Sequence, residues 1–168
     1  MRRQRILAAV FGMLMTVFAW AGAPNIPLRD LDGREHNVNE FIGHAKWVVV
    51  VTWSHDCHIC DLEIDEMAAF HAAHHEKAMV LGVTLDGAEY LKEARAFVKR
   101  HKLPFVNLIT EPSQDVMMKF GAGRFMGTPT YYIYDPKGEI VGQNIGPLTR
   151  AEVEEFISSF DKDSQNGK

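Results

Sequence analysis

The sequence predicts a three-layer α/β or α+β domain built around a mixed β-sheet. Two runs rich in β-branched residues, 45–53 (AKWVVVVTW) and 77–85 (KAMVLGVTL), are typical of strands buried on both faces. Stretches with helical spacing follow both runs. Two more strands at 130–146 precede a last helix. Strands and helices therefore alternate as a layered domain requires.

The N-terminal half is predicted as a hairpin, a strand and a helix. Residues 28–38 (LRDLDGREHNV) indicate the hairpin, because Asp32-Gly33 lies between two short flanks. The strand at 45–53 runs directly into a stretch with helical spacing that extends from residue 57 to about residue 75. The core-facing positions of this helix are Cys60, Ile64, Met67 and His71.

The C-terminal half continues the alternation after the strand at 77–85. The expected elements are a helix at 87–101, a strand at 105–109 and a helix at 113–120. Residues 130–146 (TYYIYDPKGEIVGQNIG) predict two strands around a turn at 135–138. The segment 149–160 predicts a closing helix, with Thr149 as its N-cap ahead of Glu152.

The N-terminus has the pattern of a secretory signal. Residues 1–21 contain the cationic MRRQR, an apolar run of 15 residues and an Ala-Trp-Ala cleavage site ending at Ala21. The alternative is an uncleaved membrane anchor, although a span needs roughly 20 apolar residues. We therefore expect a signal peptide at 1–21, one domain at 22–160, a polar C-terminal tail at 161–168, and a periplasmic location.

The charge balance excludes one class of partner. The whole chain has a net charge of −4, and without residues 1–21 it has 15 basic against 22 acidic residues. No basic patch or stripe interrupts this acidic chain. Nucleic-acid binding therefore has no support.

Cys57 and Cys60 are the only two cysteines of the chain. In an oxidising compartment a pair of cysteines usually forms a structural disulfide. A bridge across two intervening residues, however, closes almost no loop and removes little entropy from the unfolded chain. The spacing therefore favours a reversible redox role.

The position of the pair at the start of a predicted helix gives the two thiols different roles. Cys57 would face unpaired backbone N–H groups and the positive end of the helix dipole, which favour the thiolate. His58 adds positive charge when it is protonated. Cys60 lies one turn further, on the core-facing side. We therefore expect Cys57 to be the nucleophile and Cys60 the resolving thiol.

Glu63 lies three residues after Cys60, on nearly the same face of the predicted helix. A partly buried carboxylate there would exchange a proton with the Cys60 thiol. The alternative is an exposed glutamate in the first turns of a helix. The spacing alone leaves both open.

Metal binding is the main alternative use of these side chains. A covalent haem site is excluded, because Asp61 stands where that motif requires histidine. Copper or zinc ligation remains an alternative for four residues within one short stretch. These are His55, Cys57, His58 and Cys60. Our leading interpretation assigns no metal and no cofactor beyond the redox-active disulfide.

These motifs together resemble the TlpA/ResA-type periplasmic thiol-disulfide oxidoreductases of the thioredoxin superfamily. The likeness extends over 28–38, over VVVVTWSHDCHIC and over GTPTYYIYDPKGEIVG. It implies a thioredoxin-like α/β fold with a central mixed sheet flanked by helices, an N-terminal β-hairpin and a βα insertion. It also implies a functional Glu63 and a cis-Pro129, with the backbone of Thr128 pairing to the client chain.

The sequence departs from the family pattern at three positions. Asp56 replaces a common tryptophan before the first cysteine, and Ile59 replaces a common proline before the second. Val51 stands where cytoplasmic thioredoxins have a buried acid. Because Asp56 opposes a thiolate at Cys57 while His58 favours it, the sequence leaves the direction of electron flow open.

We expect an exported enzyme that exchanges disulfides with client proteins. A reductant that receives its electrons from a membrane donor is favoured over an oxidase. The resemblance implies service in cytochrome c maturation or metal-centre assembly. The alternatives are a disulfide oxidase and a copper chaperone. A thiol peroxidase is disfavoured by Ser54 and Val50, which stand where that chemistry needs threonine and proline. Trp53 and Phe125-Met126 are candidates for lining a client groove, although large apolar residues near a site more often belong to the core. His58, like Thr128 and Pro129, is a further candidate for client binding.

Overall fold

Strand β3, Trp47–Trp53, runs through the centre of the molecule, and all of its residues are buried. Its side chains alternate between two core clusters, one containing Val49 and Val51 and the other containing Val48 and Val50. A β-branched run without polar alternation suits a strand covered on both faces. The predicted central strand is therefore confirmed.

The computed structural model describes residues 22–121 and 123–166. The expected signal peptide at 1–21, its cleavage after Ala21 and the alternative membrane anchor lie outside the described residues. Within the described ranges no helix combines the length and apolar character needed to cross a membrane.

The sheet has seven strands in the order β2-β1-β5-β4-β3-β6-β7. The pairs β3–β4 and β4–β5 are parallel, and the other neighbouring pairs are antiparallel. The sheet is therefore mixed, as predicted. The remaining strands are β1 (Pro27–Asp30), β2 (Glu35–Asn37), β4 (Ala78–Thr84), β5 (Asn107–Ile109), β6 (Thr130–Tyr134) and β7 (Ile140–Ile145).

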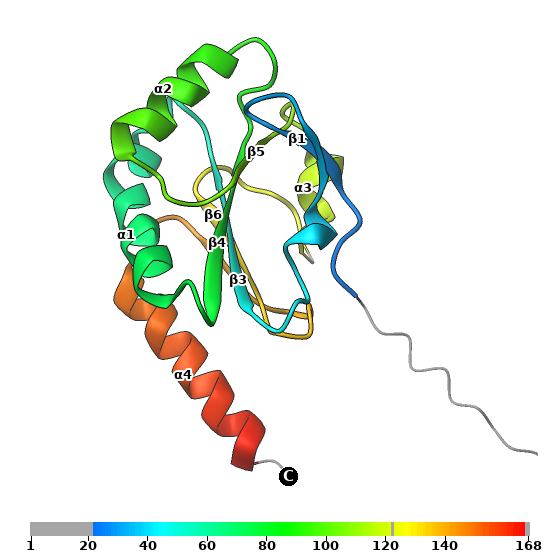
Figure 1. Cartoon of the computed structure of the whole chain (residues 1–168), viewed down its shortest axis with the longest axis vertical. Coiled ribbons are helices and arrows are strands. Elements are labelled where there is room, and N and C mark those ends of the chain that lie inside the picture. The colour runs from blue at the N-terminus through cyan, green and yellow to red at the C-terminus, as the bar shows by residue number, and fades with distance from the viewer. Residues whose placement is uncertain (1–21, 122, 167–168) are drawn as a thin grey trace, which may run out of the picture.

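Helices cover both faces of this sheet and complete the three layers (Figure 1). One core cluster joins β3 to side chains of α1, α2 and α4, while the other joins β3 to α3 and the N-terminal segment. The helices are η1 (Val38–Glu40, a 3-10 turn), α1 (His58–His74), α2 (Leu91–His101), α3 (Gln114–Met118) and α4 (Arg150–Asn166).

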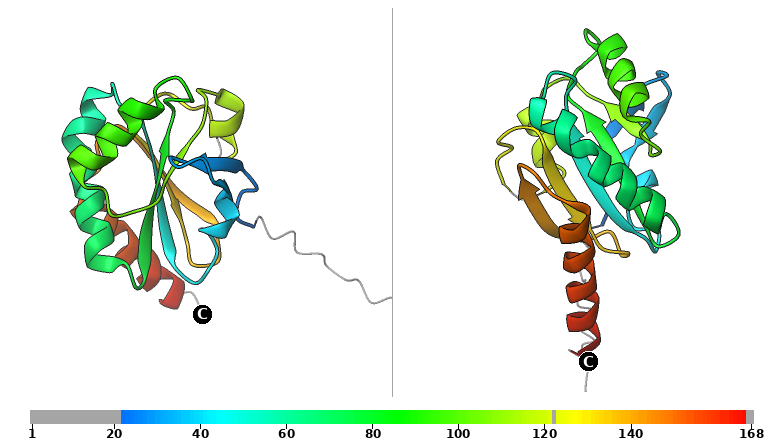
Figure 2. Two further views of the ribbon diagram at one scale, coloured as in Figure 1. Left: turned by 45° about the horizontal axis from the view of Figure 1, so that its top comes forward. Right: turned by 90° about the vertical axis from the view of Figure 1, so that its left-hand side faces the viewer.

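Two helix boundaries differ from the sequence-based expectation. Helix α2 begins at Leu91 rather than at residue 87, because Gly87 has a φ of +63° and belongs to a turn. Helix α4 continues through Asn166, so most of the expected tail at 161–168 is helical and projects past the sheet (Figure 2). The segment 161–166 contains no glycine or proline that would end the helix.

The carboxyl ends of the parallel strands β3, β4 and β5 meet at one edge of the sheet. The cysteines follow β3 at this edge. Because β6 is antiparallel to β3, its first residue, Thr130, pairs with Thr52 at the same edge. The topology thus brings three segments that are distant in sequence to one place.

Candidate active site

The two cysteines lie where β3 passes into α1 and form a disulfide, with Cα atoms 5.2 Å apart. Cys57 is the N-cap of α1, and its Sγ accepts the backbone N–H of Cys60 at 3.1 Å. Cys60 is 1% exposed, whereas Cys57 is half-buried. This asymmetry fits an accessible nucleophile at Cys57 and a shielded resolving thiol at Cys60.

The loop before β6 faces Cys57. The peptide bond between Thr128 and Pro129 is cis, as the resemblance implied. The carbonyl oxygen of Thr128 lies 3.5 Å from Cys57 Sγ, within reach of a hydrogen bond from the reduced thiol. The Thr52 hydroxyl accepts the N–H of Thr130 at 3.0 Å and fixes the start of β6 against β3. The structure therefore brings these predicted site residues together.

Glu63 is half-buried on α1, one turn after Cys60. Burial, and secondarily the charge of Glu63, raise the pKa of Tyr131 well above its usual range. Tyr131 packs in the same core cluster as Cys60. Glu63 is thus a partly buried acid whose charge reaches Tyr131, and its role toward Cys60 stays a prediction.

The other two predicted substrate-binding residues behave differently. His58 is exposed at the start of α1. Trp53 is 0% exposed and stacks on Phe97, with ring centroids 4.5 Å apart. Its indole N–H donates to Asn107 Oδ1 at 3.1 Å. The expectation that Trp53 lines a client groove is therefore wrong, because β3 directs this side chain into the core.

Asp86, a buried carboxylate bound to the segment before Cys57, was not predicted from the sequence. Asp86 lies two residues after the end of β4 and is 6% exposed. It accepts the backbone N–H of His55 at 3.1 Å, the His55 Nδ1–H at 2.6 Å and the Thr84 hydroxyl at 2.5 Å. A signal was available, because a polar residue just beyond the end of a strand that is parallel to the cysteine-bearing strand lies at the same edge of the sheet.

His55 has aromatic and charged neighbours as well. Its ring stacks on Tyr90, with centroids 4.9 Å apart and an interplanar angle of 26°. A hydrogen bond from Ser54 and, more weakly, the charge of His55 hold the pKa of Asp56 below its ordinary value. The segment before Cys57 therefore contains an imidazole, His55, and a carboxylate, Asp56, and the carboxylate of Asp86 contacts it from the segment after β4.

A cavity of about 460 Å³ opens beside this segment. It is lined on one side by residues 54–56 and on another by Gly127 and Thr128 of the loop that faces Cys57. The rest of the lining comes from the segments after β4 and β5 and from Phe125. These residues are Leu85, Asp86, Glu89, Tyr90, Glu111 and Pro112.

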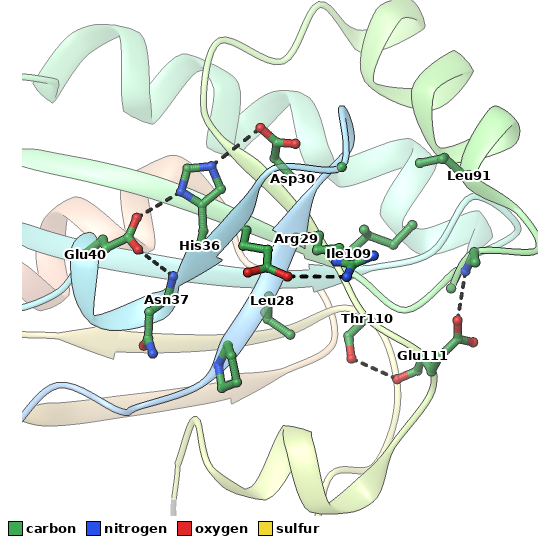
Figure 3. Close-up of a pocket in the computed structure, with 15 residues that line it drawn as sticks. Leu28, Arg29, Asp30, His36, Asn37, Glu40, Leu91, Ile109, Thr110 and Glu111 are labelled. Carbon is green, nitrogen blue, oxygen red and sulfur yellow. Dashed lines mark hydrogen bonds and ion pairs between the residues drawn. The ribbon is translucent and has the colours of Figure 1, made fainter.

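A second cavity, of about 610 Å³, lies between the β1–β2 hairpin and the ends of β5 and α2 (Figure 3). There His36 bridges Glu40 at 2.9 Å and Asp30 at 3.5 Å. The hydrogen bond with Glu40 is the main factor that raises the pKa of His36. Neither the segment 54–56 nor the loop of Thr128 that faces Cys57 lines this cavity, so it is not the candidate active site. Glu111 lines both cavities.

The side chains with ligand potential differ from the predicted set of histidines and cysteines. Among the described residues, His55, Asp56 and Asp86 each offer a ligand atom within 4.8 Å of the others. The hydrogen bond to Asp86 already uses Nδ1 of His55. Both cysteines are in the disulfide, and thiolate ligation requires the reduced pair.

The chain resembles known proteins over most of its length. A model of the AhpC/TSA family matches residues 21–143. The chain is 27% identical over 138 residues to "Thiol-disulfide oxidoreductase ResA" of Bacillus thuringiensis (strain Al Hakam), covering 82% of this chain and 76% of that protein. It is 29% identical over 136 residues to "Thioredoxin-like protein YneN" of Bacillus subtilis (strain 168), covering 80% and 76%.

Solved structures share the fold at lower identity. A DsbF homologue from Corynebacterium diphtheriae has a TM-score of 0.71 at 21% identity, covering 83% of this chain and 86% of that chain. The MTB dsbF structure has a TM-score of 0.66 at 22% identity, covering 80% and 94%. These matches show a thioredoxin-like arrangement of the sheet and helices.

Proposed function

Because the chain belongs to the AhpC/TSA family of thioredoxin-like proteins, we propose that it is an exported thiol-disulfide oxidoreductase that reduces disulfides in client proteins. One observation carries this proposal. A disulfide with one accessible and one buried sulfur begins helix α1, opposite the carbonyl oxygen of Thr128. The names of the ResA relatives support the same reaction class.

The start of α1 prepares Cys57 to act as the nucleophile. The N-cap position directs backbone N–H groups and the positive end of the helix dipole toward Sγ. In the reduced enzyme the hydrogen bond from the Cys60 N–H would stabilise a thiolate at Cys57. Because the thiolate is the attacking species, this geometry favours reaction at Cys57.

The reaction then proceeds through two exchanges. The Cys57 thiolate attacks a client disulfide, a Cys57–client disulfide forms, and the second client sulfur leaves. Cys60 loses its proton to Glu63, and its thiolate attacks Cys57 Sγ and releases the first client sulfur. The client is reduced by two electrons, and the enzyme ends with the Cys57–Cys60 disulfide. An external dithiol, which we propose to be a membrane electron donor, restores the reduced pair.

The charges near Cys57 support the reductive direction. Asp56 precedes Cys57, and its lowered pKa keeps it anionic at neutral pH. A nearby anion destabilises the thiolate and therefore the reduced form of the pair. The disulfide is favoured as a result, which is the property of a reductant. Asp56 thus offsets part of the thiolate stabilisation that the start of α1 provides, and the reduction potential of the pair decides between a reductant and a disulfide oxidase.

The reduction potential of the Cys57–Cys60 pair tests the direction. The protein is equilibrated in glutathione buffers of known ratio, and free thiols are alkylated and counted by mass spectrometry. We expect a value near the thioredoxin end of the scale, roughly −270 mV. A value near −120 mV, typical of a strong oxidant, would instead make the protein a disulfide donor.

The copper-chaperone alternative predicts a different property of the same cysteines. It requires stoichiometric Cu(I) binding to the reduced protein, with His55 or His58 completing the site. His55 would have to bind the ion through Nε2, because its Nδ1 donates to Asp86. A spectroscopic Cu(I) titration of the reduced protein distinguishes the two functions. We expect no stoichiometric binding.

We also propose that the protein works in the periplasm after removal of residues 1–21. The signal-like pattern of the N-terminus supports this location, and so does a chemistry that needs client disulfides. N-terminal sequencing of the protein from a periplasmic fraction tests it. A first residue of Gly22 is expected, whereas an intact N-terminus in the membrane fraction would identify the anchored form.

A further inference from the structure

His55 is held in one orientation beside the redox pair. A carboxylate can only accept a hydrogen bond, so His55 Nδ1 must carry the proton that it shares with Asp86 at 2.6 Å. Stacking on Tyr90 restrains the plane of the ring. None of the hydrogen bonds among residues 22–121 and 123–166 uses Nε2 of His55. This arrangement leaves Nε2 available to a bound group.

The carboxylate that orients His55 is held by the end of β4, and the residues after it are held by the end of β5. Asp86 accepts the Thr84 hydroxyl at 2.5 Å. The next residues are tied to the end of β5, since Gly87 N–H donates to Thr110 O at 3.1 Å and Ala88 N–H donates to Glu111 at 2.9 Å. Figure 3 shows this last bond at the edge of the second cavity. Asp86 is therefore part of a fixed support and not of a mobile loop.

His55 also shares its cavity with the segment that faces Cys57. The cavity of about 460 Å³ is lined by His55 and by Thr128. The Thr128 carbonyl oxygen lies 3.5 Å from Cys57 Sγ. A client disulfide attacked by Cys57 must have its second sulfur on the far side from Sγ, because exchange is an in-line displacement. The cavity between His55 and Thr128 is the described space next to this carbonyl group that could hold the second sulfur.

We infer that His55, oriented by Asp86, is a further catalytic residue that protonates the client sulfur displaced by Cys57. This inference rests on the proposed function. In this step the Cys57 thiolate forms a bond to one client sulfur, and the client S–S bond breaks. The bonding electrons go to the second sulfur, which takes the proton from Nε2 of the His55 imidazolium. His55 becomes neutral, and Asp86 acts as a positioning residue through Nδ1.

Several other titratable groups surround His55 and affect how the rate of this step depends on pH. Asp86 follows β4, Tyr90 precedes α2, and Asp56 belongs to the same segment. Glu89 and Glu111 line the same cavity.

The test compares two substrates that differ in their need for a proton. Reduced protein reacts with glutathione disulfide, which releases an alkyl thiolate of ordinary basicity, or with an aryl disulfide such as 5,5′-dithiobis(2-nitrobenzoate). The aryl thiolate is weakly basic and leaves without protonation. A group that only positions Cys57 affects both reactions, whereas a proton donor to the leaving sulfur affects the first.

The variants are His55→Gln and Asp86→Asn, each with a matched control. His74→Gln breaks another histidine–carboxylate pair, His74–Glu154 at 2.7 Å, at the opposite end of α1. Asp135→Asn changes another aspartate that is 6% exposed, at the opposite end of the sheet. Thermal unfolding of every variant reports whether it is folded.

We expect His55→Gln to slow the reaction with glutathione disulfide about tenfold at pH 7, and Asp86→Asn to slow it less. The aryl disulfide should react at the wild-type rate in both variants. The part of the pH–rate profile in which the rate falls as His55 loses its proton should disappear in His55→Gln. Neither control should change either rate. If His55→Gln does not fold, Asp86→Asn and the wild-type pH profile carry the test.

Equal slowing with both substrates would overturn the inference and make His55 a residue that acts on Cys57 itself. Unchanged rates with both would also overturn it. The proposed function fails in a different way. In that case wild-type protein and Cys57→Ser would react alike with glutathione disulfide, irrespective of His55.

Discussion

The two ends of the central sheet each contain one buried aspartate, and the two aspartates have different partners. Asp86, at the end where β4 stops, and Asp135, in the β6–β7 turn at the other end, are both 6% exposed. Asp135 accepts the N–H groups of Lys137 and Glu139, both at 2.9 Å, within its own turn. Asp86 accepts the backbone and ring N–H groups of His55, which is 31 residues away in sequence.

This difference separates a structural carboxylate from one suited to chemistry. A carboxylate that accepts only N–H groups of its own turn stabilises that turn. A carboxylate that binds a histidine ring from another segment fixes a titratable group beside the cysteines. Burial and hydrogen-bond satisfaction are similar at both ends, so the identity of the partner carries the functional information.

Substitution of either cysteine should have the largest effect on disulfide exchange, because both cysteines lie at one end of the sheet. Cys57→Ser should abolish disulfide exchange, because it removes the accessible nucleophile. Cys60→Ser should keep the first attack and accumulate mixed disulfides on Cys57, since the buried resolving thiol is absent. Non-reducing gels and mass spectrometry measure both. If Cys57→Ser accumulates the mixed disulfides instead, the two roles are reversed.

Glu63 sharpens the comparison, because we propose that this carboxylate at the redox end accepts the proton of the second thiol, Cys60. Glu63→Gln should slow the resolution of the Cys57–client disulfide about a hundredfold at pH 7, since Cys60 loses its proton acceptor. The apparent pKa that governs this step should rise. Single-turnover rates between pH 5 and 9 measure both effects.

The control for Glu63 is Glu155→Gln, which changes an exposed glutamate of α4. It should leave the rate of resolution unchanged. An identical pH–rate profile in wild type and Glu63→Gln would show that Glu63 takes no part in the proton transfer.

Asp135 tests the structural end of the sheet. Asp135→Ala leaves the N–H groups of Lys137 and Glu139 without their acceptor. It should lower the free energy of unfolding by about 2 kcal/mol, because unpaired polar groups of this kind cost about 1–3 kcal/mol each when buried. Urea unfolding measures the loss. The rates of disulfide exchange should stay at the wild-type level, and a changed rate would contradict the division between the two ends.

The smallest effect concerns His71, a histidine at the structural end. Its Nδ1 accepts the N–H of Val80 at 3.1 Å. Burial, followed by the charges of His75 and Lys46, lowers the pKa of His71. In the unfolded chain the pKa is about 6.5, so at lower pH the unfolded state binds more protons. The stability contributed by neutral His71 is therefore present above pH 6.5 and is lost as the pH falls through the folded-state pKa.

His71→Asn isolates this contribution, because asparagine still offers an acceptor and does not titrate. Urea unfolding at pH 7.5 and pH 5 should show a larger loss of stability in wild type than in the variant. His36, whose pKa is raised, changes stability in the opposite direction in both proteins, so it cancels from the difference. Equal losses would show that His71 makes no contribution.

Most of the fold was predictable from residue patterns. The doubly buried strands, the helix after the cysteines and the final hairpin each have a strong local period. The start of α2 and the end of α4 differed from the prediction, because neither is determined by the spacing of apolar residues. Gly87 adopts a positive φ, which delays α2 to Leu91. The polar end of α4 has no apolar period, yet it lacks a helix breaker and continues the helix.

The candidate site was predictable where a motif marks it and not where tertiary contact creates it. Cys57, Cys60 and Pro129 stand in recognisable short motifs. Asp86 is a single aspartate after a strand, and its partner His55 belongs to another segment. Trp53 was misassigned because its closeness to the cysteines in the sequence does not say on which face of β3 its side chain lies. Counting by two from the buried Val51 places Trp53 in the same core cluster.

Strand β3 begins and ends with a tryptophan, and each of them can report on its surroundings by fluorescence. Trp53 shares a core cluster with Cys60, while Trp47 packs edge-on against Phe160 of α4 with centroids 5.4 Å apart. Residues 22–168 contain no other tryptophan. The strand therefore has one fluorophore beside the disulfide and another beneath the projecting helix. In Trp47→Phe the remaining emission reports the oxidation state of the cysteines, and in Trp53→Phe it reports the docking of α4.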